Sequence, residues 1–68
     1  MNILVTVIIQ QEDNWYVAKC IENDVASQGK TVDEAMDNLK EALDLYYEDL
    51  SDMPVIKKTF ITTMEIAI

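Results

Sequence analysis

The side chains of this 68-residue chain that could carry out chemistry are thirteen carboxylates and a single thiol, with no histidine. Without an imidazole, Ser-His-Asp and Cys-His nucleophilic catalysis are excluded. Two-metal nuclease chemistry needs several carboxylates that converge from different elements. Here Glu65 is the only acid inside an expected strand, and the others fall at corners or on one helix face. We therefore expect no enzymatic activity, no catalytic residue, no metal site and no cofactor.

Two further motifs are weighed and set aside. A reactive thiolate needs a cation or a helix N-terminus beside it, and Lys19 points to the opposite face of the strand that carries Cys20. We expect Cys20 to be a buried structural residue. Residues 27–31 (Ser-Gln-Gly-Lys-Thr) have a faint phosphate-loop appearance, but they lack the Walker spacing of glycines and are interpreted as a turn.

The charge balance narrows the class of partner. Thirteen acidic residues against five lysines give a formal net charge of -8. Phosphate backbones are bound largely through lysine and arginine, so direct nucleic acid binding is disfavoured and a basic protein is the more natural partner. No apolar run approaches the roughly 20 residues of a membrane span, and no secretory signal pattern follows Met1. We expect a soluble, cytoplasmic protein that binds no membrane.

The first part of the chain reads as three strands. Residues 3–9 and 15–21 are rich in β-branched and aromatic side chains, and residues 10–14 between them carry turn formers. After a second polar corner, residues 25–28 form a short third strand. Gly29, the only glycine, is the best candidate for a position with positive φ.

The second part reads as a helix and a strand. Thr31 and Glu34 make a capping box, and apolar residues then recur every three or four positions until Met53 and Pro54 stop the helix. Residues 59–68 change to a period of two, which predicts a final strand. The expected fold is α+β, a single domain over residues 1–68 in the order β-β-β-α-β, with a four-stranded sheet and one helix packed on one face.

One helix covers only one face of such a sheet, and a chain this short buries only about 60% of its unfolded surface. If Tyr16, Ala18 and Cys20 face the helix, an apolar surface stays uncovered on the other side. Such surfaces mark association, so we expect a homodimer or a higher homo-oligomer. The residues of this expected self-association face are Leu4, Ile8, Trp15, Val17 and Ile21.

The acidic residues of the helix recur on the face opposite its apolar stripe. Like charges four residues apart each cost a few tenths of a kcal/mol, so helix stability alone favours lysines at some of these positions. The two interpretations are a solvated face and a surface complementary to a basic partner. For partner contact we select the acids of the corner before the third strand and of the helix, namely Glu22, Asp24, Asp37, Glu41 and Asp44.

Five short motifs resemble the HicB-like antitoxin family, whose usual pattern is a YVA strand, a TQGDT turn and an EEA…NLKEAL helix. The resemblance covers about residues 3 to 48. The matching residues are Tyr16-Val17-Ala18, Ser27-Gln28-Gly29-Lys30-Thr31, Asp33-Glu34-Ala35, Asn38-Leu39 and Glu41-Ala42-Leu43.

The resemblance implies a partial ribonuclease-H-like fold and a function as an antitoxin that binds a small basic HicA-like toxin, an mRNA interferase, and blocks its access to RNA. Full-length members carry a C-terminal DNA-binding segment, and this chain ends at Ile68 without one, so DNA binding is not expected. Two alternatives stay open. One is an orphan HicB-like protein that self-associates in a scaffolding or regulatory role, and the other, which is disfavoured, is a degenerate metal-dependent nuclease.

Overall fold

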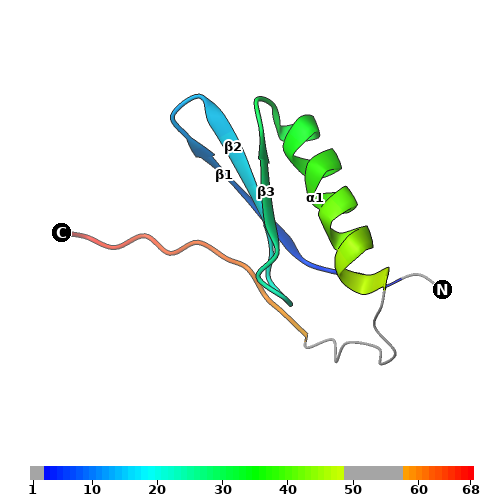
Figure 1. Ribbon diagram of the computed structural model, residues 1–68. Coiled ribbons are helices and arrows are strands. Elements are labelled where there is room, and N and C mark those ends of the chain that lie inside the picture. The colour runs from blue at the N-terminus through cyan, green and yellow to red at the C-terminus, as the bar shows by residue number, and fades with distance from the viewer. Residues whose placement is uncertain (1–2, 49–57) are drawn as a thin grey trace.

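The structure is a computed structural model that describes residues 3–48 and 58–68. Three strands form one antiparallel sheet in the order β1-β2-β3, and a single helix packs on one face of it, over β2 and β3 (Figure 1). The elements are β1 (Val7–Glu12), β2 (Trp15–Cys20), β3 (Ala26–Gly29) and α1 (Val32–Glu48). The expected α+β class is confirmed.

The first hairpin is tighter than the sequence predicts. β1 continues through Glu12, and the loop consists of Asp13 and Asn14 alone. Two-residue hairpin loops favour turns with positive φ at the first central position, and aspartate tolerates that region better than most residues. Asp13 occupies it with a φ of 53°. The polar run 10–14 is therefore partly strand, since hydrogen bonding to β2 outweighs the low strand preference of its residues.

The side chains of β2 alternate across the sheet as expected. Ala18 and Cys20 are fully buried, and Tyr16 is half-buried against the same core, so all three face α1. Trp15 and Val17 lie on the opposite face, where successive residues of a strand must point.

The N-terminus of α1 is capped as the sequence predicts. The Glu34 N–H donates to the Thr31 hydroxyl at 3.0 Å, and the Lys30 N–H donates to the Glu34 carboxylate at 3.3 Å. These bonds satisfy backbone donors that have no partner within the helix. The helix begins at Val32, which confirms the predicted start. The predicted end at Met53 and Pro54 lies outside the described residues.

The core between sheet and helix is small. Leu39 of α1 is its central side chain, and Ala18 and Ala35 let the two layers approach closely. A ring of half-buried apolar residues surrounds this cluster: Val7, Ile9, Tyr16, Val25 and Leu43. No residue of β1 is fully buried, because α1 lies over the other two strands.

Gly29 does not have the positive φ expected of it. A glycine is needed here instead because the first turn of α1 lies too close to leave room for a side chain. A Cβ at this position would lie 2.5 Å from the Ala35 nitrogen and 2.8 Å from the carbonyl carbon and Cβ of Glu34. Two of these three atoms belong to the backbone, so no rotation of a side chain could relieve the contact.

The predicted fourth strand is wrong for this structure. Residues 58–68, which we call the C-terminal arm, have no strand assignment, and every one of them is exposed. The arm projects away from the sheet (Figure 1). An alternating pattern supplies one apolar side to a strand, but a strand also needs a neighbouring strand to pair with, and the described sheet contains only β1, β2 and β3.

Replacing Gly29 with alanine tests the close approach. We expect Gly29→Ala to destabilise the chain by about 1–3 kcal/mol, because the added methyl group overpacks a backbone contact. The measurement is the urea midpoint followed by circular dichroism. Gln28→Ala is the matched control, since Gln28 is exposed and only its backbone carbonyl is used, accepting a bond from the Asn38 side chain. Equal midpoints for the two variants would contradict the packing argument.

Candidate functional site

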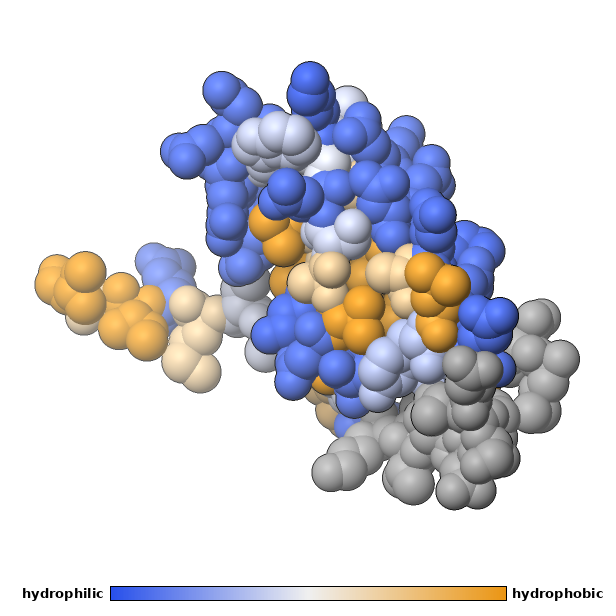
Figure 2. All heavy atoms as spheres, viewed as in Figure 1, coloured by the Kyte–Doolittle hydropathy of each residue, from blue (hydrophilic) through white to orange (hydrophobic). Residues whose placement is uncertain are grey.

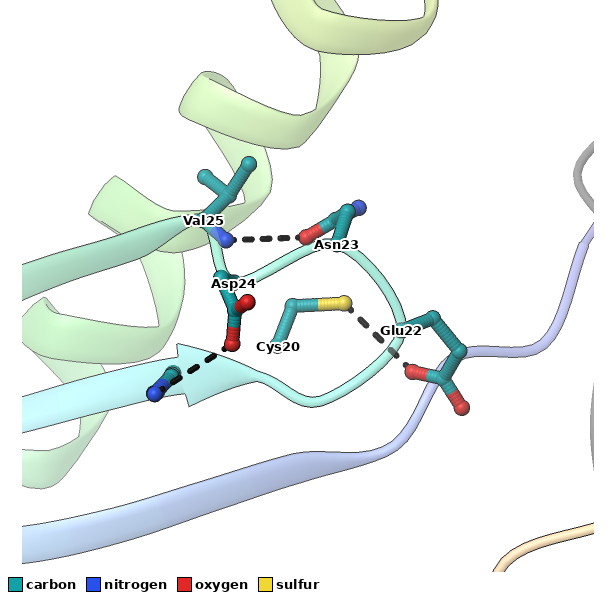
Figure 3. Close-up of polar contacts among 6 residues, drawn as sticks. Cys20, Glu22, Asn23, Asp24 and Val25 are labelled. Carbon is teal, nitrogen blue, oxygen red and sulfur yellow. Dashed lines mark hydrogen bonds and ion pairs between the residues drawn. The ribbon is translucent and has the colours of Figure 1, made fainter.

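The corner that joins β2 to β3 is a tight, internally bonded loop (Figure 3). The Cys20 N–H donates to the Val25 carbonyl at 2.8 Å, and the Asp24 N–H donates to the Cys20 carbonyl at 2.9 Å. The Val25 N–H donates to the Asn23 side-chain oxygen at 3.0 Å. Asp24 has a φ of 62°, in the left-handed region that aspartate and asparagine tolerate. The corner therefore has one defined shape.

Glu22 ties this corner to the residues before β1. Its Oε1 atom accepts a 2.8 Å hydrogen bond from the Thr6 N–H and lies 3.5 Å from the Cys20 sulfur. The bond from Thr6 holds the pKa of Glu22 below its ordinary value of 4.5, because a donated N–H stabilises the charged carboxylate. This residue, selected as a partner contact, is already engaged within its own chain.

Asp24 presents its carboxylate to solvent at the same corner. Its Oδ1 lies 3.3 Å from the Lys19 ammonium, and 81% of its side chain is exposed. An ion pair this exposed contributes little to stability. Of the two corner acids, Asp24 is the one more open to an incoming group.

Cys20 lies between these acids as a buried thiol (Figure 3). Burial raises its pKa above 9.0, since desolvation disfavours the thiolate, and the Glu22 carboxylate acts in the same direction. The expectation of a buried cysteine is confirmed.

Asn23 connects the corner to the far end of α1. Its Nδ2 donates to the Tyr47 hydroxyl at 2.9 Å, which places the corner beside the last turn of the helix. The sequence analysis did not identify Thr6, Asn23 and Tyr47 as residues whose hydrogen bonds fix the position of the corner. Asn23 carried a signal, because asparagine favours turns in which its side chain bonds the backbone two residues on. Tyr47 carried none, because it falls on the apolar face and its partner is 24 residues away.

The acidic face of α1 is solvent-exposed along its whole length. Its residues recur at helical spacing on the side away from the sheet, and we call them the acidic stripe. They are Asp33, Asp37, Glu41, Asp44 and Glu48. Lys40 is the only base in α1, and its ammonium lies 3.1 Å from the Asp44 carboxylate. No basic residue occupies the last turn, although the helix dipole favours one there.

The structure thus gathers the five selected partner residues into two groups. Asp37, Glu41 and Asp44 share the acidic stripe, and Glu22 and Asp24 lie on the corner, beside the end of α1 at Tyr47. The two groups come from different elements. Their part in binding stays a prediction.

The expected self-association face is less apolar than the sequence indicates. Cross-strand pairing places Ile8 beside Lys19, Val17 beside Gln10 and Trp15 beside Glu12, so polar groups interrupt it. Ile21 follows β2 and is half-buried, and Leu4 precedes β1 with 83% of its surface exposed. A shallow hollow on this face is lined by Val17, Ala26, Ser27 and Gln28.

Among residues 3–48 and 58–68, no group of three or more Cys, Asp or Glu side chains is placed to hold a metal ion. In the same part of the chain, no helix is both long and apolar enough to cross a membrane.

Residues 5–66 match the family DUF7387, which is described as a family of unknown function. No curated protein and no solved structure matches the chain.

The bond between Asn23 and Tyr47 can be tested with a pair of neighbouring tyrosines. We expect Tyr47→Phe to lower the free energy of unfolding by about 0.5–1.5 kcal/mol, because it removes the acceptor of a part-buried hydrogen bond. Tyr46→Phe is the control, since the Tyr46 ring packs edge-on against Tyr47 and its surface is 46% exposed. Urea unfolding of the two variants gives the comparison, and an equal loss in both would contradict a specific tether.

The lowered pKa of Glu22 predicts a pH dependence. Its charged form contributes stability that is fully present above pH 4.5 and is lost as the pH falls through the lower folded-state pKa. Glu22→Gln keeps an oxygen acceptor for Thr6 but has no charge to lose. The wild-type advantage over this variant in urea midpoint should be constant near neutral pH and shrink below pH 4.5. A difference in urea midpoint between wild type and Glu22→Gln that stays constant from pH 7 to pH 3 would contradict the predicted role of the Glu22 charge.

Proposed function

This chain belongs to the DUF7387 family, and we propose that it is a HicB-like antitoxin domain, a non-enzymatic inhibitor of a small basic HicA-like mRNA interferase. In this proposal the acidic surface of the chain covers the surface by which the toxin binds RNA. The observation that carries this proposal is the acidic stripe on α1. The stripe is exposed, and Lys40 is the only basic residue of the helix.

The stripe destabilises the helix through repulsion between like charges, and folding alone does not offset this cost. Asp33 and Asp37, Asp37 and Glu41, and Asp44 and Glu48 are like-charge pairs at four-residue spacing, and each pair destabilises the helix by a few tenths of a kcal/mol. Lys40 relieves only Asp44. A basic partner converts this repulsion into attraction, because its cations approach several carboxylates at once.

The order of elements supports the same proposal. Three antiparallel strands followed by one helix agree with the first four elements of the expected β-β-β-α-β order. The motifs behind the resemblance also lie where that order needs them. Tyr16, Val17 and Ala18 are in β2, and Gly29 ends β3 against the first turn of α1. The four-stranded, partial ribonuclease-H-like form of the fold remains part of the proposal.

The mechanism follows from where the charges lie. Long-range attraction between the stripe and a cationic toxin speeds the encounter, and short-range contacts then set the lifetime of the complex. Asp24 extends the acidic surface at the corner beside Tyr47. Glu22 contributes mainly by fixing the shape of that corner, since its carboxylate is bonded to Thr6.

An orphan HicB-like protein that self-associates in a scaffolding or regulatory role is the second candidate. The exposed apolar residues of the C-terminal arm favour it. Such a protein would form assemblies by itself and would not bind the product of the adjacent reading frame.

The antitoxin proposal is tested by removing charge from the stripe. We expect Asp37→Asn/Glu41→Gln to slow association with the candidate toxin, the product of the adjacent reading frame, by about tenfold at low salt, because steering is lost. Surface plasmon resonance at two salt concentrations is the measurement, and the difference should shrink at high salt.

The matched control is Glu12→Gln/Asp13→Asn, which removes the same number of negative charges at the tip of the β1–β2 hairpin. It should leave association within about twofold of wild type, since neither residue belongs to the acidic stripe. Equal slowing by both pairs of substitutions would indicate an effect of net charge alone. The absence of any complex at either salt concentration would overturn the antitoxin proposal.

A further inference from the structure

The C-terminal arm is the most exposed apolar part of the described chain. Figure 2 shows it as a largely hydrophobic extension beside a body whose upper end, at the β1–β2 turn, is hydrophilic. The exposed fractions of its large apolar residues are 80% for Phe60, 56% for Ile61, 81% for Met64 and 69% for Ile66, and Ile68 is fully exposed. Within the arm, the Lys58 ammonium lies over the Phe60 ring at 5.4 Å from its centroid.

The arm is long enough to pair with the whole of β1. Its eleven residues span about 36 Å when extended at about 3.3 Å per residue, and the six residues of β1 span about 20 Å.

β1 offers an open edge for the arm. The Ile21 N–H donates to the Thr6 carbonyl at 2.9 Å, and bonded positions recur at every second residue of an antiparallel ladder. Ile8 and Gln10 therefore direct their backbone groups to β2. Val7, Ile9 and Gln11 direct theirs away from it, and β1 has no second neighbour among the described strands.

The apolar side chains at the β1 edge are also incompletely buried. Val7 and Ile9 face the α1 side of the sheet but are only half-buried, because α1 lies over β2 and β3. β3 is a poorer acceptor, since it is four residues long and ends at the turn into α1.

We infer that two copies of this chain exchange their C-terminal arms, each arm pairing with the β1 edge of the other copy as a fourth strand. Such an exchange is self-complementary, because each copy donates one arm and accepts one. The side of the arm with Phe60, Met64 and Ile66 then covers Val7 and Ile9 of the second copy.

The arm itself brings no net charge to the contact. Lys58 and Glu65 are the only charged residues of the arm, so its net charge is zero, whereas the whole chain carries -8. The repulsion that disfavours contact between two acidic stripes does not act on the arm. The inference does not depend on the antitoxin proposal, since every measurement uses the purified chain alone.

The test changes one side of the arm and then the other. Met64→Lys/Ile66→Lys should raise the dissociation constant of the dimer at least about a hundredfold, because two apolar side chains lose their burial. The matched control is Thr63→Lys/Ala67→Lys, which adds the same charge to the opposite side and should stay within about threefold of wild type. Sedimentation equilibrium measures the mass, and circular dichroism checks that both variants keep the fold.

A second pair of variants tests the edge. Gln11→Pro removes an outward N–H of β1 but no bond to β2, so it should weaken the dimer about tenfold, while Gln11→Ala should not. A wild-type mass of one chain at about 100 μM would overturn the exchange, because the β1 edge would then be left without an arm from a second copy. So would a Met64→Lys/Ile66→Lys variant that stays dimeric, since the interface would then lie elsewhere.

Discussion

The close approach of β3 to the first turn of α1 is the contact on which the rest of the structure depends. At Gly29 the chain turns from the sheet into the helix with no room for a Cβ against Ala35. That approach lays α1 across β2 and β3 and brings Leu39 over Ala18. The opposite side of the helix then faces solvent along its whole length. A surface of carboxylates is thus held in place by Ala35 and Leu39 on the reverse side of the same helix, which pack against the sheet.

The second organising element is polar. The corner at residues 21–25 is held by bonds that reach outward in two directions, from Glu22 to Thr6 and from Asn23 to Tyr47. These bonds join the segment before β1 and the end of α1 to the same loop, so that one end of the molecule is braced by hydrogen bonds while the other is braced by close packing. A domain with so small an apolar core gains much of its definition from such long-range polar contacts.

What could be predicted from the sequence was local. The helix start follows from Thr31 and Glu34, which interact within one turn, and the face of β2 follows from the strict alternation of Tyr16, Ala18 and Cys20. Features set by distant partners could not be read in this way. The reason for Gly29 lies in another element, the bond to Glu22 spans 16 residues, and the pattern of residues 59–68 cannot specify which edge a strand pairs with. For the candidate site, exposure of the helical acids follows from periodicity, whereas the internal bonding of Glu22 does not.

The buried thiol of Cys20 makes opening of the corner at residues 21–25 measurable by chemical labelling. In the closed corner the sulfur is inaccessible and its ionisation is suppressed, so alkylating reagents cannot attack it. Labelling must await an opening of the loop, and when closing is faster than the reaction its rate reports the fraction of molecules in which the corner is open. Since the chain contains no other cysteine, mass spectrometry of the intact protein measures the labelled fraction directly. Any ligand that docks on the corner and holds it closed would lower the rate at which Cys20 is alkylated.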